Sequence, residues 1–166
     1  MMVSNIEEYC FFTQEIKFRK KFCNKEIKLL QFFHSKTNLF PQNILVHKNY
    51  LFFFINNADY FEAKKFLRSL REVLNFKVLI IREEKRLINL IFSFFPDIYI
   101  HDLKLHIDEQ EDLKTITVFF LSYKERGIAI GRKGEYIKAV NNVFKEFSSS
   151  YKDTGAIKLN CKITSL

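Results

Sequence analysis

A glycine-rich segment in the last third of the chain carries the clearest chemical signal. Three of the four glycines fall within residues 126–134, which read Arg-Gly-Ile-Ala-Ile-Gly-Arg-Lys-Gly. Glycine is costly in ordered backbone, so this crowding predicts a conformation that a side chain would obstruct. Gly131 and Gly134 flank Arg132 and Lys133, so bare amides and two cations can meet the same anion. We expect this segment to bind a phosphate group, the alternative being an ordinary basic turn before a helix.

Residues 59–74 carry a second group of cations. Apolar residues recur there at helical spacing, which predicts one helix with a core-facing side. The core-facing residues are Ala63, Leu67, Leu70 and Leu74. Lys64, Arg68 and Arg71 lie at i, i+4 and i+7, so they share another face of that helix. Together with Lys65 they form a basic stripe that would hold phosphates by charge.

The composition favours a nucleic-acid partner. The 166 residues carry a net charge of +8, and the pI is about 9.3. Such an excess of cations indicates an acidic partner, with nucleic acid ahead of a membrane surface. The longest apolar runs are far shorter than the roughly 20 residues that span a bilayer, so no membrane association is expected. No signal peptide is expected either, because Glu7 and Glu8 interrupt any apolar leader.

The remaining side chains give no sign of catalysis. Three cysteines at wide spacing form no CxxC pair, which indicates free thiols in a reducing compartment. His101 and His106 would face opposite sides of a predicted strand, so they cannot share a metal ion. No nucleophile–base pair, Walker motif or paired carboxylate stands out. We expect a non-enzymatic protein without metal, cofactor or small-molecule substrate, in the cytoplasm or alternatively in an organelle.

Hydrophobic periodicity predicts an α+β fold in which one unit occurs twice. The first copy has a helix at 24–33, strands at 42–47 and 50–55, the helix at 59–74 and a strand at 76–81. Lys48-Asn49 is typical of a hairpin turn, and the triple Phe at 52–54 predicts a strand buried on both faces. Before this copy, residues 9–16 are interpreted as a strand with a turn near Thr13, and a basic cluster follows them.

The second copy repeats this order. Its pattern gives a helix at 84–94, strands at 98–107 and 115–123, the glycine segment, a helix at 135–147 and a strand at 156–163. No linker rich in Gly, Ser or Pro separates the copies. We therefore expect three parts: a basic extension at 1–23, a first domain at 24–83 and a second domain at 84–166, each domain being a three-stranded sheet backed by helices.

The order of elements and the glycine segment together resemble a type II KH domain. Its order is α-β-β-α-α-β, with a GxxG loop before the long helix, and residues 131–134 occupy that place. Two such modules in tandem resemble the NusA transcription factor family, in particular its short archaeal form of paired KH modules. The likeness covers about residues 24–163 and is strongest at 127–140 and 87–96.

This resemblance implies a clamp for single-stranded RNA at the glycine segment. A KH groove takes about four nucleotides, with phosphates against the GxxG loop and bases over an apolar floor that would include Ile137. The amides of residues 132–135 would point outward near the positive end of the next helix, and strand backbone would read the base edges. The RNA-binding residues expected here are Lys124, Arg126, Gly127, Ile128, Ile130, Gly131, Arg132, Lys133, Gly134 and Lys138.

The first module departs from the KH pattern. Its own GxxG should stand at residues 61–64, where this chain has Phe-Glu-Ala-Lys. Because glycine is absent and Glu62 would repel a phosphate, we expect this module to lack a backbone clamp. The stripe of Lys64, Lys65, Arg68 and Arg71 would still bind RNA by charge.

The family likeness predicts a factor that modulates transcription elongation or termination by holding nascent single-stranded RNA. It also implies RNA polymerase as a further partner. Two alternatives stay open: a KH-containing ribosomal or ribosome-assembly protein, and a degenerate KH pair that serves as a scaffold in an RNA polymerase complex.

Overall fold

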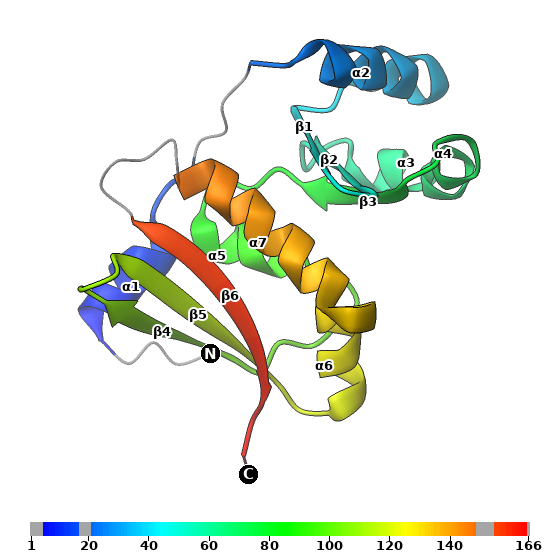
Figure 1. Cartoon of the computed structure of the whole chain (residues 1–166). Helices are drawn as coiled ribbons and strands as arrows, with labels where there is room; N and C mark the ends of the chain where they lie inside the picture. The colour runs from blue at the N-terminus through cyan, green and yellow to red at the C-terminus, as the bar shows by residue number, and fades with distance from the viewer. Residues whose placement is uncertain (1–4, 17–20, 149–154, 166) are drawn as a thin grey trace. The chain divides into compact units, whose positions relative to one another are not determined.

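The chain folds into two compact units. The computed structural model describes residues 5–16, 21–148 and 155–165, with backbone alone at 147 and 148. One unit comprises residues 1–17 and 86–166 and holds all four glycines, and we call it the glycine-loop unit. The other, residues 18–85, contains no glycine, and we call it the glycine-free unit. Each has a three-stranded mixed sheet backed by helices, which confirms the predicted α+β class (Figure 1).

The glycine-free unit has the predicted α-β-β-α-α-β order. Its elements are α2 (Asn24–Thr37), β1 (Asn43–His47), β2 (Tyr50–Ile55), α3 (Tyr60–Lys64), α4 (Leu67–Val73) and β3 (Lys77–Arg82). The central strand β2 is antiparallel to β1 and parallel to β3. Lys48 adopts a left-handed φ of +53° in the tight turn between β1 and β2, where the sequence predicts a hairpin.

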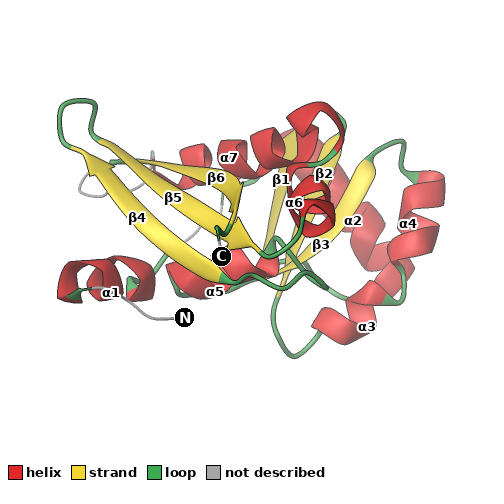
Figure 2. Cartoon of the chain, turned by 90° about the horizontal axis from the view of Figure 1, so that it is seen from below, coloured by secondary structure: helices red, strands yellow, loops and turns green. Residues whose placement is uncertain are grey.

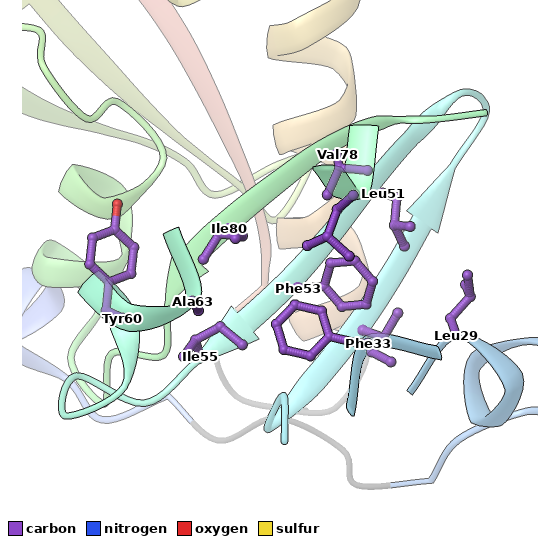
Figure 3. Close-up of a cluster of buried hydrophobic side chains, with 11 residues drawn as sticks. Leu29, Phe33, Leu51, Phe53, Ile55, Tyr60, Ala63, Val78 and Ile80 are labelled. Carbon is purple, nitrogen blue, oxygen red and sulfur yellow. The ribbon is translucent and has the colours of Figure 1, made fainter. Parts of the chain in front are cut away.

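Aromatic side chains fill the core between this sheet and its helices. Phe33 of α2 and Phe53 of β2 are fully buried, and their ring centroids lie 4.5 Å apart (Figure 3). Tyr60 and Ala63 of α3 belong to the same cluster. Burying one such aromatic side chain contributes about 1.5–3 kcal/mol. All of β2 is buried, which confirms the prediction that the triple Phe is covered on both faces.

The helix predicted at residues 59–74 is two helices. A turn at Lys65 and Phe66 separates α3 from α4, and there the amide of Phe66 donates to the carbonyl of Ala63 at 3.0 Å. The helical spacing of apolar residues continues across this turn, with Leu70 fully buried and Leu67 packed at the margin of the core. The prediction was wrong because periodicity records which face is apolar and not whether the backbone is continuous.

The glycine-loop unit has the same order around a second sheet, β4-β5-β6, preceded by one additional helix. Its elements are α1 (Ile6–Thr13), α5 (Leu87–Ser93), β4 (Asp102–Asp108), β5 (Leu113–Phe120), α6 (Tyr123–Ile130), the 3-10 turn η1 (Arg132–Gly134), α7 (Glu135–Ser148) and β6 (Ala156–Ile163). In the view from below, the long helix α7 runs beside this sheet (Figure 2).

The sheet of the glycine-loop unit is buried on one face and exposed on the other. Leu159 and Cys161 of β6 are buried, whereas Lys158 and Asn160, which alternate with them, are exposed. The strand β6 has the predicted bounds. The strand β4 begins at Asp102 and not at residue 98, and Asp97 takes a left-handed φ of +62° in the turn that precedes this segment.

Residues 9–16 do not form the predicted strand. They lie largely in α1, which begins where the side chain of Asn5 accepts the amide of Glu8 at 2.7 Å. Glu8 is itself buried, and its Oε1 accepts the amide of Leu105 in β4 at 3.0 Å. An N-cap Asn with acidic residues in the first turn is a helix signal that outweighs the β-prone aromatics. This first helix belongs to the glycine-loop unit.

Within the described residues, no helix is both long and apolar enough to cross a membrane.

Candidate nucleic-acid interface

The glycine segment forms a sharp corner between α6 and α7. Ser122 begins α6 by accepting the amide of Glu125 at 3.2 Å. The helix ends at Gly131, whose φ of +78° no longer fits a helix, and its amide donates back to the carbonyl of Gly127 at 2.9 Å. Lys133 and Gly134 also have positive φ, of +54° and +70°. The chain therefore changes direction within one 3-10 turn, and α7 starts at once (Figure 1).

The three glycines of this segment differ in whether a side chain could replace the hydrogen at Cα. At Gly131 an added Cβ would lie 2.6 Å from the Cβ of Tyr136, so both the space and the dihedral angle exclude a side chain. At Gly134 there is room, with the nearest atom 3.8 Å away on Ile130, and only the positive φ favours glycine. At Gly127 nothing lies within 4 Å, so its missing side chain leaves helix backbone open to an approaching ligand.

The outward-facing amides of the corner are fewer than expected. The amides of Gly134 and Glu135 donate to the carbonyls of Gly131 and Arg132 and are therefore not free to bind an anion. The amides of Arg132 and Lys133 stand at the start of η1, where an amide has no partner within the same turn. An anion at this corner would meet these two amides and the exposed side chains of the same two residues.

The predicted cations around the corner divide into two groups. Lys124 and Lys138 are exposed, and the Cε of Lys138 lies about 4.0 Å from the position of a Cβ on Gly134, so this side chain borders the corner. Arg126 is half-buried, and its Nε donates to the carbonyl of Cys161 in β6 at 3.1 Å. Arg126 therefore fastens α6 to the sheet and is less available to a ligand than the two lysines.

The predicted apolar floor is only partly exposed. Ile128 is 55% exposed on α6, whereas Ile130 and Ile137 are half-buried. The neighbouring strand β6 offers no free backbone groups at Leu159, because the Asn141 side chain accepts its amide at 2.7 Å and donates to its carbonyl at 3.1 Å. The expectation that strand backbone reads base edges therefore fails at Leu159.

Two side chains that hold the corner in place were not predicted. Tyr136 donates its hydroxyl to the carbonyl of Phe94 at the end of α5, and Asn141 joins α7 to β6 as described above. Each bond spans many positions along the chain, and a single polar residue on an amphipathic helix gives no sequence signal for its partner. They position the loop by bonding α7 to α5 and β6.

The basic stripe of the glycine-free unit lies around one open hollow. This hollow has a volume of about 540 Å³ and is lined by Lys64, Lys65, Leu67, Arg68, Arg71 and Glu72. Lys65 pairs with Glu62 at 2.7 Å and Arg68 with Glu72 at 3.1 Å, but all four side chains are more than half exposed. Exposed pairs of this kind contribute little stability, so they can exchange for a phosphate at small cost.

The turn between α3 and α4 is the counterpart of the glycine corner. The GxxG of the first module was expected at residues 61–64, but these residues lie inside or at the end of α3. The corresponding corner is Lys65-Phe66, a few residues later, and it also lacks glycine. Here the amides of Lys65 and Phe66 donate to the carbonyls of Glu62 and Ala63, so this corner presents side chains rather than amides.

Metal binding finds no support among the described residues, where no group of three or more His, Cys, Asp or Glu side chains is arranged to hold an ion.

Neither a protein-family model nor a curated protein matches the sequence. A solved structure titled "Crystal structure of APE1850" is similar, with a TM-score of 0.62 and 19% sequence identity. The match covers 84% of this chain and 100% of that chain, which is more of this chain than either unit alone. At this identity the similarity concerns the fold, and it extends over parts of both units.

Proposed function

We propose that this protein is a non-enzymatic single-stranded RNA-binding protein that clamps the RNA backbone at the glycine corner. The observation that carries the proposal is the corner itself, where Arg132 and Lys133, with exposed cationic side chains and the first two amides of the 3-10 turn, lie between two glycines of positive φ. Such a corner suits a phosphodiester, which combines negative charge with acceptor oxygens. The excess of positive charge over the whole chain supports an acidic polymer as the ligand.

The tandem of α-β-β-α-α-β units favours a NusA-like role among RNA-binding proteins. In this role the protein would hold nascent RNA and act on transcription elongation or termination, with RNA polymerase as a second partner. Co-purification tests that part of the proposal. Elution with RNA polymerase supports it, and elution with ribosomal subunits replaces it with a ribosomal role.

The clamp is tested by reversing charge at the corner. Arg132→Asp combined with Lys133→Asp should weaken binding of a labelled, short single-stranded RNA by roughly 100-fold or more, because two charge-assisted contacts of about 1.5–3 kcal/mol each are lost. Fluorescence anisotropy measures the affinity, and thermal melting shows that the fold is intact.

A matched control separates the effect of contacts at the corner on RNA affinity from the effect of the protein's net charge. Lys158→Asp combined with Lys162→Asp changes the same number of charges on exposed positions of β6 in the same unit. This control should lose only the screened, long-range part of the attraction, a few-fold at most. Equal losses for both double variants would show that RNA is held by overall charge, and unchanged affinity for the corner variant would favour the protein scaffold.

A further inference from the structure

The glycine-free unit carries a stack of one cation and two aromatic rings. The guanidinium carbon of Arg82, at the end of β3, lies 4.0 Å from the ring centroid of Tyr60 and 4.9 Å from that of Phe61. The two rings meet edge to face, with centroids 5.5 Å apart. Arg82 also donates from Nη1 to the Oδ1 of Asn57 at 3.1 Å, which fixes the plane of the guanidinium.

The two rings of this stack differ in exposure. Tyr60 is 4% exposed and belongs to the core, whereas Phe61 is 68% exposed. An apolar ring held out to solvent gains no stability from burial, and α3 does not need it for its core contacts. The exposed ring of Phe61 therefore lies at the surface beside the guanidinium of Arg82.

This surface adjoins the basic hollow. Lys65 follows the last residue of α3 and keeps helical dihedral angles, so it lies on the same side as Phe61, four positions earlier. The Nζ of Lys64, which also lines the hollow, lies 5.6 Å from the ring centroid of Tyr60. Two of the four cations of the hollow, Lys64 and Lys65, therefore lie near the pair of rings that includes the exposed Phe61. A chain of alternating phosphates and flat bases matches both features.

We propose that Phe61, supported by Arg82, is a base-stacking platform for the same single-stranded RNA. The phosphates of this segment lie in the hollow lined by Lys64, Lys65, Arg68 and Arg71. The inference rests on the proposed RNA function and adds a second contact region in the unit that has no amide clamp. Stacking tolerates any base, because every base has a π-face, so this region binds without sequence preference.

A protein partner is the other occupant that an exposed Phe can serve. The surroundings favour RNA, since the hollow presents Lys64, Lys65, Arg68 and Arg71 against the single carboxylate of Glu72, whereas the cores of protein interfaces are depleted of charge.

The test uses the full chain and two substitutions of Phe61. Phe61→Leu keeps an apolar side chain but removes the π-face, and it should weaken binding of a short single-stranded RNA roughly 5-fold to 100-fold. Phe61→Trp retains the ring and should bind at least as well as the parent protein. The chain contains no tryptophan, so the introduced indole is the sole fluorophore of its kind, and stacking of a base should quench its emission.

Phe40→Leu is the control, because Phe40 is a 55% exposed ring of the same unit that stacks on His34, with a centroid distance of 4.0 Å, and does not line the hollow. It should leave the affinity unchanged. One outcome would overturn the stacking platform and leave the clamp at the glycine corner supported. In it the corner variant binds RNA more weakly, Phe61→Leu keeps the affinity of the Phe40→Leu control, and the emission of the indole in Phe61→Trp is not quenched. If the parent protein binds no RNA, both proposals fail. Unchanged RNA affinity together with loss of a co-purifying protein would assign Phe61 to a protein interface and overturn the platform.

Discussion

The corner of the glycine-loop unit and the corner of the glycine-free unit occupy the same place in two copies of one order of elements. In the corner of the glycine-loop unit, positive φ at Gly131, Lys133 and Gly134 starts a separate 3-10 turn, and its first two amides have no partner within that turn. In the second, the amides of Lys65 and Phe66 bond within the turn. Glycine therefore decides whether a helix–helix corner offers backbone or only side chains to a ligand. The first corner suits a phosphate held by amides, and the second suits recognition by charge and stacking.

Gly131→Ala should produce the largest effect on stability. The backbone there has φ +78° and ψ 172°, a region that only glycine adopts readily, and a Cβ would approach that of Tyr136 to 2.6 Å. Strain and overpacking together should cost about 2–5 kcal/mol in the free energy of unfolding, measured by urea denaturation.

Gly127→Ala is the matched control for this substitution. Gly127 lies inside α6, and nothing lies within 4 Å of a Cβ added there. The alanine should therefore stabilise the protein by roughly 0.4–1 kcal/mol, because it lowers the conformational entropy of the unfolded chain. If Gly131→Ala were as mild as this control, the corner would not need glycine and the contrast between the two units would lose its basis.

Lys65→Ala should have a smaller effect, and on RNA binding rather than on folding. Its charge lies at the hollow, so affinity for single-stranded RNA should fall a few-fold and the dependence of log K on log salt should become shallower by about 0.7. Lys28→Ala, an exposed lysine of α2 in the same unit, is the control. If the two variants showed the same salt dependence, the hollow would not be part of the RNA-binding surface.

The smallest expected effect concerns Cys161, whose reactivity reports how tightly α6 and β6 are packed. Burial raises the pKa of its thiol from 9.0 to about 12, while the nearby Arg126 acts in the opposite direction. Because the folded state favours the neutral thiol, this contribution to stability is complete below pH 9 and is lost as the pH rises toward about 12. In mildly alkaline solution a thiol reagent should label the exposed Cys10 and Cys23 and reach Cys161 only after unfolding. Fast labelling of Cys161 in the folded protein would contradict this packing.

The sequence was sufficient where local patterning decides the structure. Alternation located β6, the triple Phe located β2, and the crowding of glycine located the corner with its positive φ values. These features depend on each residue's own conformational preference or on a period within one element.

Features that depend on distant partners could not be predicted. The carboxylate of Glu8 binds an amide 97 positions away, so α1 joins the second sheet although the chain between them forms another unit. The number of free amides at the corner likewise depends on which carbonyls the turn brings near, and no residue type encodes that. The stack of Arg82 on Tyr60 and Phe61 forms only when β3 lies beside α3.

The most direct measurement follows the backbone amides of both corners during titration with a short single-stranded RNA. In ¹H–¹⁵N correlation spectra, we expect large shifts for the amides of Arg132 and Lys133, which begin the 3-10 turn at the corner. The amides of Lys65 and Phe66, already bonded within their turn, should shift little even while RNA occupies the neighbouring hollow. Equal shifts at both corners, or shifts at the glycine-free corner alone, would contradict the central claim that glycine confines the backbone clamp to one unit.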